Sequence, residues 1–404
     1  MHFRVTTLVL VLGPACVQAC SSALSPKTAT TARTATAVAD PERPAAAVVD
    51  SAAPAPEPTA EEREVARLEG VSQRKARDPE VLLALGTARA RANDLRGAAL
   101  EYRRAARLAP KDFRPPYNLG QVLVRLDRMG EALEALEAAR RIAPNNVNLL
   151  VDLGIAQRKA GRLTDSRAAL SRAVKVAPRS HRAQLNLALT LEQMGQSRPA
   201  MAACRRAAAV RPGDVTAHLR LGVMLGRANK RKDAAEAFRR AVAADSKSLD
   251  AHANLGTVLL QLGQHAESAK HLALAARSQP NDGPLQMNLG LALQSSGDHA
   301  GAASAYRRAS KALPASAEAA VRLGLALART GDNAEAQRQV ARALGLDRKL
   351  RPAIDAVVQE LGQQQRLEPA LALTRAILAC FPEDKAAQHN RLALESMIKR
   401  TKGQ

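Results

Sequence analysis

Small and apolar residues return every 34 positions along most of the chain. Glycine stands at seven of eight successive positions of this period, alanine fills the remaining one, and a leucine precedes each. The eight positions are Gly86, Gly120, Gly154, Ala188, Gly222, Gly256, Gly290 and Gly324. An alanine or serine follows twelve residues later, from Ala98 to Ala336, and an alanine seven residues after that, from Ala105 to Ala343. This regular recurrence predicts one helical unit repeated along the chain.

Each unit is predicted to contain two helices joined by a tight turn. Proline closes most units, as at Pro110 and Pro144. It ends the second helix because it lacks an N–H group and disfavours the helical conformation of the residue before it. A glycine inside a helix costs about 1 kcal/mol relative to alanine, so its regular return implies a packing requirement. We predict that two helix backbones approach each other at the glycines with no Cβ between them.

The unit combines Leu-Gly in its first helix, Ala-x3-Tyr/Phe/Leu in its second helix and a terminal proline, and it resembles the tetratricopeptide repeat. Nine such units fit between Pro79 and Asp384, so the repeats occupy residues 79–384. Pro116 and Pro352 stand where bulky residues are usual, and the ninth unit has Val358 in place of the glycine. The resemblance implies an all-α fold, a right-handed superhelix (α-solenoid) of nine helix-turn-helix repeats with capping helices at its ends.

Four segments lie outside the predicted repeats. Residues 1–19 are typical of a secretory signal peptide, because Arg4 precedes a short apolar run and small residues. Residues 20–60 are rich in Ala, Thr, Pro and Ser, and we predict a disordered tether because they cannot bury enough apolar surface to fold. Residues 61–78 and residues 385–404 are predicted to be capping helices, the second with a short tail, which give the open array polar ends.

The residues around Cys20 resemble a bacterial lipobox, in which the cysteine becomes the lipid-modified N-terminus. Ala19 could equally mark an ordinary signal-peptidase site, which would leave a soluble periplasmic or secreted protein. We therefore expect an exported protein, either periplasmic or an outer-membrane lipoprotein. Membrane contact is expected only through this N-terminal anchor, because a membrane-spanning helix needs about 20 apolar residues and no later segment reaches that length.

Charge indicates the kind of partner. The chain has 60 Lys and Arg against 38 Asp and Glu, a formal net charge of +22. We expect acidic protein or peptide partners, with an attraction that weakens in salt. The alternative is a basic solenoid that binds nucleic acid or an anionic envelope polymer, since positive charge alone gives sequence-independent binding. The export signal and the scarcity of aromatic residues, which are 2% of the chain, argue against nucleic acid.

The sequence contains none of the common catalytic motifs that we searched for. We find no phosphate-binding glycine loop, His-Glu-x-x-His motif or nucleophile elbow, and therefore predict a non-enzymatic protein without a cofactor. His218 and His252 occupy equivalent places in adjacent units, but two imidazoles without a third ligand are weak evidence for a metal site, and none is expected. Cys204 and Cys380 lie several repeats apart, too far for a disulfide, so both are predicted to be core residues.

The resemblance to tetratricopeptide repeats also implies that the first helices line a concave groove for extended or helical peptides. Two residues before the glycine, four units carry an asparagine: Asn118, Asn186, Asn254 and Asn288. Asparagine offers a donor and an acceptor to a peptide backbone, although it could instead bond locally. Arg125, Lys159 and Arg227 form a basic row that could favour acidic ligands or stabilise helix C-termini. Tyr117 is also expected to face this groove, in a protein-protein interaction scaffold of the bacterial cell envelope whose partner and oligomeric state remain open.

Overall fold

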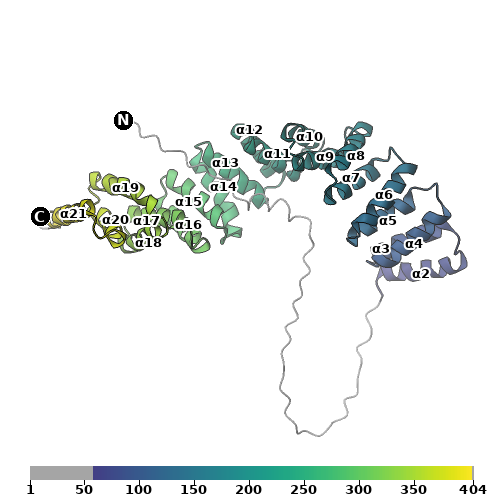
Figure 1. The fold of residues 1–404 in the computed structure, drawn as a ribbon, viewed down its shortest axis with the longest axis horizontal. Coiled ribbons are helices and arrows are strands. Elements are labelled where there is room, and N and C mark those ends of the chain that lie inside the picture. The colour runs from purple at the N-terminus through teal and green to yellow at the C-terminus, as the bar shows by residue number, and fades with distance from the viewer. Residues whose placement is uncertain (1–57, 403–404) are drawn as a thin grey trace, which may run out of the picture. The chain divides into compact units, whose positions relative to one another are not determined.

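The computed structural model describes residues 58–402, and every regular element in that part of the chain is a helix. Nine helix pairs follow one another (Figure 1). The first helices are α3 Pro79–Arg91, α5 Arg114–Arg125, α7 Val147–Lys159, α9 His181–Gln193, α11 Val215–Arg227, α13 Leu249–Gln261, α15 Gly283–Ser295, α17 Ala317–Thr330 and α19 Arg351–Gln363. The second helices are α4 Leu95–Leu108, α6 Met129–Ile142, α8 Leu163–Val176, α10 Ser197–Val210, α12 Arg231–Ala244, α14 His265–Ser278, α16 His299–Ala312, α18 Asn333–Leu346 and α20 Leu367–Cys380. The predicted all-α fold is confirmed.

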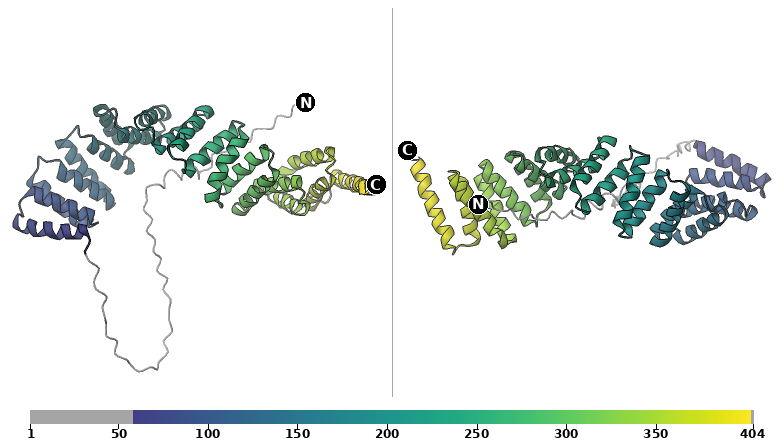
Figure 2. Two further views of the ribbon diagram at one scale, coloured as in Figure 1. Left: turned by 180° about the vertical axis from the view of Figure 1, so that it is seen from behind. Right: turned by 90° about the horizontal axis from the view of Figure 1, so that it is seen from above.

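The described residues form two compact units, 58–211 and 212–402. Within each unit the two helices of a pair lie side by side, and most second helices also contact the first helix of the next pair (Figure 2). The ninth pair is different, because α18 packs against its second helix α20 more than against its first helix α19. A short 3₁₀ helix, η1 Arg348–Leu350, precedes α19 and changes the entry into that pair. The least regular repeat in the sequence is therefore also the least regular in its packing.

The glycines make room for one side chain from the second helix of the same pair. A Cβ added to Gly290 would lie 2.4 Å from Cε1 of Tyr306, and one added to Gly222 would lie 2.5 Å from Cε1 of Phe238. In the seven pairs that have the glycine, the obstructing residue is Tyr102, Leu136, Leu170, Phe238, Leu272, Tyr306 or Val340. The predicted exclusion of a Cβ is confirmed, and at Gly120, Gly256 and Gly324 backbone atoms of the second helix also lie 3.1–3.2 Å from the added Cβ, but the nearest atom at each glycine belongs to a side chain. A side chain of the second helix therefore occupies most of the space that the missing Cβ leaves.

The fourth and ninth pairs have no glycine at the repeat position. In both pairs the residue on the first helix is larger than glycine, and the facing residue on the second helix is small. Ala188 replaces the glycine in the fourth pair, and the residue at the matching place on α10 is the small Cys204. In the ninth pair Val358 is matched with Thr374 on α20. All four side chains are buried. A larger residue on the first helix thus accompanies a smaller one on the second, as a close-packed interior of fixed volume requires.

Small residues on the second helices form the rest of the repeated core. The rows that run from Ala98 to Ala336 and from Ala105 to Ala343 are fully buried. Two members of the first row are serines, and their hydroxyl groups bond to the first helix of the same pair. Ser166 Oγ donates to the Gly154 carbonyl at 2.7 Å, and Ser268 Oγ donates to the Gly256 carbonyl at 2.6 Å. Serine can replace alanine at these places because its buried hydroxyl has a hydrogen-bond partner.

The turn inside each pair uses one residue in the left-handed region. Backbone φ is positive at Asn93, Asp127, Gly161, Gly195, Asn229, Gly263, Gly297, Gly331 and Gln365, which are spaced by one period. Glycine adopts this conformation without steric cost, and Asn and Asp tolerate it better than other residues. The turns therefore fix the end of each first helix.

Two further helices flank the pairs. The helix α2 Ala60–Arg74 begins with a capping box between Thr59 and Glu62 and packs against α3. The helix α21 Lys385–Lys402 packs against α20 through Ala387, Leu394 and Ile398. None of the helices that the structure describes is long and apolar enough to cross a membrane. The predicted signal peptide, Cys20 and most of the predicted tether lie outside the described residues.

Ion pairs join neighbouring second helices within each unit. Arg103 pairs with Glu131 at 2.6 Å, and two further arginines repeat this contact at the same sequence separation. They are Arg239 with Glu267 at 3.2 Å and Arg307 with Glu335 at 2.5 Å. The side chains are partly exposed, so each pair contributes at most about 1 kcal/mol. These contacts therefore contribute little to the stability of the repeats.

Candidate functional site

Asp152 on α7 connects three successive first helices of the unit 58–211. Its Oδ2 accepts hydrogen bonds from the Tyr117 hydroxyl at 2.6 Å and from Gln121 Nε2 at 2.8 Å, both on α5. Its Oδ1 accepts a hydrogen bond from Arg182 on α9. Burial, followed by the hydrogen bond to Asp152, raises the pKa of Tyr117. Tyr117 lies on a first helix as predicted, but its hydroxyl group already donates its hydrogen bond to Asp152.

The asparagines of the predicted ladder differ in their hydrogen bonds. Asn186 and Asn254 each donate from Nδ2 to the backbone carbonyl four residues earlier, at 2.8 Å. Asn288 on α15 donates to Thr257 Oγ1 on α13 at 3.4 Å. Local bonding, the alternative that the sequence left open, thus occupies one N–H of Asn186 and Asn254. Each of these amides still carries an oxygen and a second N–H.

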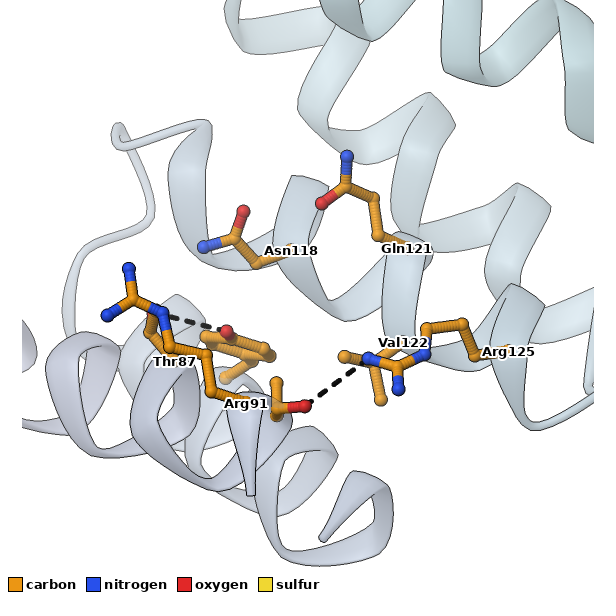
Figure 3. Close-up of a pocket in the computed structure, with 8 residues that line it drawn as sticks. Thr87, Arg91, Asn118, Gln121, Val122 and Arg125 are labelled. Atoms are coloured by element: carbon orange, nitrogen blue, oxygen red, sulfur yellow. Dashed lines mark hydrogen bonds between the residues drawn. The ribbon is translucent and has the colours of Figure 1, made fainter. Parts of the chain in front are cut away.

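A pocket of about 450 Å³ lies between α3, α4 and α5 (Figure 3). Its lining consists of Thr87, Ala90, Arg91, Tyr102, Asn118, Gln121, Val122 and Arg125. Figure 3 shows the guanidinium groups of Arg91 and Arg125 on opposite sides of the pocket. Asn118 and Gln121, which lie on the same helix as Arg125, are above them in this view. These lining residues supply two positive charges and no carboxylate.

Hydrogen bonds fix the polar wall of the pocket. Thr87 Oγ1 donates to the Leu83 carbonyl at 2.8 Å, and the Tyr102 hydroxyl donates to Thr87 Oγ1 at 3.2 Å. Burial raises the pKa of Tyr102, so the hydroxyl keeps its proton. Arg125 donates from Nη2 to Asn93 Oδ1 at 3.0 Å and from Nη1 to the Ala90 carbonyl at 3.3 Å. Both acceptors of Arg125 are neutral oxygens, so its positive charge is not cancelled by these bonds.

The pocket unites two of the residues predicted from the sequence, Asn118 and Arg125. Lys159 and Arg227 are exposed at the last turns of α7 and α11 and do not line it. The six other lining residues were not among the predicted site residues: Thr87, Ala90, Arg91, Tyr102, Gln121 and Val122. A signal for two of them existed, because Thr87 and Gln121 both directly follow a repeat glycine.

A family model for the tetratricopeptide repeat matches residues 73–147, 151–215, 219–283 and 287–349, which is more than half of the chain. The chain belongs to the tetratricopeptide repeat family. This membership identifies a protein-protein interaction scaffold, since proteins of this non-enzymatic family generally bind protein or peptide partners. The predicted family and the general predicted function are therefore confirmed.

Several solved structures, two of them described as tetratricopeptide repeat proteins, resemble part of the fold. YrrB, described as a protein with an unusual peptide-binding site, is 21% identical with a TM-score of 0.41, over 46% of this chain and 95% of its own. MamA protein is 20% identical with a TM-score of 0.39, over 43% of this chain and 94% of its own. A protein from Parabacteroides merdae is 18% identical with a TM-score of 0.42, over 58% of this chain and 93% of its own. These similarities concern the fold and carry no information on ligands. A search of curated protein sequences finds no match.

His218 and His252 of this tetratricopeptide repeat protein each contact the loop that precedes their helix. Nε2 of His218 and Nε2 of His252 lie 2.9 and 3.1 Å from the backbone carbonyl six residues earlier. Glutamine makes the same bond from Nε2 in three other repeat positions: Gln184, Gln286 and Gln388. Since an amide replaces the imidazole in this bond, the two histidines serve as donors to the preceding loop. Among residues 58–402, no group of three or more His, Cys, Asp or Glu could hold a metal ion.

His252 also forms a stacked pair with His271 on α14. Their Nδ1 atoms are 2.8 Å apart and their ring centroids 5.0 Å apart. Because His252 donates from Nε2 when neutral, its Nδ1 accepts from Nδ1–H of His271. Burial first, and then repulsion from His252, lowers the pKa of His271, against an opposing contribution from Glu267. A second proton between the two Nδ1 atoms, on Nδ1 of His252, would place two N–H groups against each other.

We expect acidification from about pH 7 to 5 to loosen the sixth repeat, in which α13 and α14 pair. In the unfolded chain His271 binds a proton near its ordinary pKa of 6.5, above its folded pKa. The neutral His271 ring therefore contributes to the free energy of unfolding above about pH 6.5, and this contribution decreases as the pH falls below 6.5. Amide hydrogen exchange in α13 and α14 measures this change. His271→Gln should reduce the pH dependence, whereas His389→Gln, at an exposed site on α21, should not. Equal pH dependence in the wild type and His271→Gln would contradict the assignment.

Proposed function

We propose that this tetratricopeptide repeat protein binds acidic segments of partner proteins along its first helices. The pocket between α3, α4 and α5 carries the proposal, because polar side chains at repeated positions of two first helices converge there on open space. Arg91 and Arg125 bring positive charge to this pocket, in a chain whose net charge is +22. An acidic ligand would be attracted to both.

The asparagines provide the second part of this proposal. Asn254 and Asn288 lie on the neighbouring first helices α13 and α15 of the unit 212–402, and Asn118 and Asn186 lie on α5 and α9 of the unit 58–211. An amide can donate to a peptide carbonyl and accept from a peptide N–H whatever the ligand side chains are. Within each unit, the first helices thus offer contacts to a polypeptide backbone that do not depend on ligand sequence.

Joint replacement of Asn186, Asn254 and Asn288 by alanine is expected to weaken partner binding about tenfold or more. Each lost hydrogen bond contributes roughly 0.5–1.5 kcal/mol, and 1.4 kcal/mol corresponds to a factor of ten. Cross-linking in the native envelope followed by mass spectrometry first identifies the partner, and its affinity for purified wild type and variant is then compared. Circular dichroism verifies that the helices persist.

The matched control is joint replacement of Asn281 and Asn390, two exposed amides outside the first helices of the pairs. Affinity should be unchanged in this control. If the first-helix triple variant binds the partner as tightly as the wild type, the asparagines do not contact it and the ladder proposal fails.

We further propose that the protein is exported to the bacterial cell envelope and anchored by a lipid on Cys20. The support is the signal-like segment 1–19 and the lipobox resemblance that ends at Cys20. Cys20→Ala should move the protein from the membrane fraction to the soluble fraction, because one residue would carry the acyl chains. Cys16→Ala is the control and should leave the protein in the membrane fraction. A wild-type protein found wholly in the soluble periplasm would instead indicate signal-peptidase cleavage without lipidation.

A further inference from the structure

We propose that the pocket between α3, α4 and α5 binds one anionic side chain of a partner polypeptide, through its carboxylate or phosphoryl oxygens. The inference rests on the proposed function, since it names the chemistry recognised by one part of that surface. Carboxylates and phosphoryl groups share several negatively charged acceptor oxygens, and arginine recognises both through paired N–H donors.

The charges around the pocket favour an anion. Arg91 at the end of α3 and Arg125 at the end of α5 place guanidinium groups on opposite sides of the same space (Figure 3). Glu64 on α2 interacts electrostatically with Arg91, and its carboxylate is already paired with Arg67 at 2.7 Å. An anion between the two arginines would therefore gain attraction from both without a carboxylate among the lining residues to repel it.

The polar side chains are held in place before a ligand arrives. Arg125 is fixed by Asn93 and by the Ala90 carbonyl, and Gln121 is fixed by Asp152. The Tyr102 hydroxyl is held by its hydrogen bond to Thr87 Oγ1. Groups that are already ordered lose less conformational entropy on binding, which increases affinity.

The apolar lining residues can contact the ligand's carbon atoms. Ala90 from α3 and Val122 from α5 lie beside the polar groups of the pocket. A volume of about 450 Å³ is sufficient for one side chain together with water. The site thus combines a charged end for the anion with a small apolar surface for the methylene groups that carry it.

The methyl groups of Ala90 and Val122 provide a direct test by nuclear magnetic resonance. The full chain, labelled with ¹³C at alanine and valine methyl groups, is titrated at constant ionic strength with short capped peptides that differ at one central residue. That residue is glutamate, phosphoserine or glutamine. We expect saturable shifts of the Ala90 and Val122 methyl signals with at least one anionic peptide, and at least about tenfold weaker binding of the glutamine peptide.

Arg91→Gln should weaken binding of the anionic peptide at least about fivefold. Arg107→Gln, which removes the same charge from an exposed site at the end of α4 outside the pocket, should leave binding unchanged. Methyl spectra of both free variants verify that the repeats stay folded. Binding of the glutamate peptide supports a carboxylate ligand, and binding of the phosphoserine peptide alone assigns the site to a phosphoryl group.

Two results overturn the proposal. One is the absence of shifts at Ala90 and Val122 with both anionic peptides, and the other is equal weakening by Arg91→Gln and Arg107→Gln, which would mean attraction to net charge alone. Either result leaves the asparagine test of the proposed function intact, because that test measures capture of a whole partner. Conversely, a failed asparagine test with intact peptide binding would retain this pocket and reject the ladder.

Discussion

Replacing Gly290 by alanine is expected to destabilise the seventh repeat by about 1–3 kcal/mol, the usual cost of overfilling a packed core. The new Cβ would lie 2.4 Å from Cε1 of Tyr306, far inside van der Waals contact. The tyrosine ring is fully buried and its hydroxyl donates to Gln294 at 3.0 Å, so the ring has no open space into which to move. The opening free energy from amide hydrogen exchange in α15 and α16 measures the loss.

Gly345→Ala is the matched control, because Gly345 lies in α18 and a Cβ added there meets nothing within 4 Å. Alanine has the higher helix propensity, so this variant should gain up to about 1 kcal/mol. The two substitutions make the same chemical change and are expected to have opposite signs. If both stabilise their repeats, Gly290 is not required for packing.

Leu170→Ala is expected to destabilise the third repeat by roughly 2–5 kcal/mol, as do other substitutions that leave a cavity in a core. Leu170 is fully buried, and its Cγ lies 2.5 Å from the place that a Cβ on Gly154 would occupy. Hydrogen exchange in α7 and α8 reports the change. Leu100→Ala on α4 removes an equal side chain that is 53% exposed and should cost less than about 1 kcal/mol.

The effect of Gly154→Ala on the stability of the third repeat should have opposite signs in the wild type and in the Leu170→Ala variant. In the wild type it forces a Cβ against Leu170 and destabilises the repeat. In the Leu170→Ala background the same methyl group enters the cavity and should restore about 1 kcal/mol. The double-mutant cycle measures the coupling energy between the two residues. Equal effects of Gly154→Ala in both backgrounds would show that the residues do not share the same space.

The helix pairs could be predicted because their determinants are local. The residues that mark the first helix, the second helix and its end all lie within one period of 34 residues, and the same signals return in successive repeats. The left-handed turn residues obey the same period, from Asn93 to Gln365. Because the same signals return in other repeats, an exception such as Pro116, which lies near the first turn of α5, does not change the prediction. A single unit would have been far more ambiguous.

The side chain that packs against the repeat glycine could also have been identified from the sequence, but the prediction placed the backbone of the second helix there instead. The spacing indicated that a Cβ was excluded, and this is correct for Gly154 and Gly290. It did not indicate whether backbone or side chain filled the space. The exchange of sizes between Ala188 and Cys204 could have revealed the answer, because a backbone contact would not require a smaller residue on the second helix.

The chain's sequence alone determined the repeat, its family and the rows of polar residues on the first helices, since these depend on spacing along one chain segment. Only the tertiary structure decided that the Tyr117 hydroxyl is bonded to Asp152, that Asn288 bonds to Thr257 on the preceding first helix, and that Arg91 and Arg125 face one pocket. Periodicity places side chains on a face. Hydrogen bonds and cavities depend instead on distances between helices, which packing fixes to within an ångström or so.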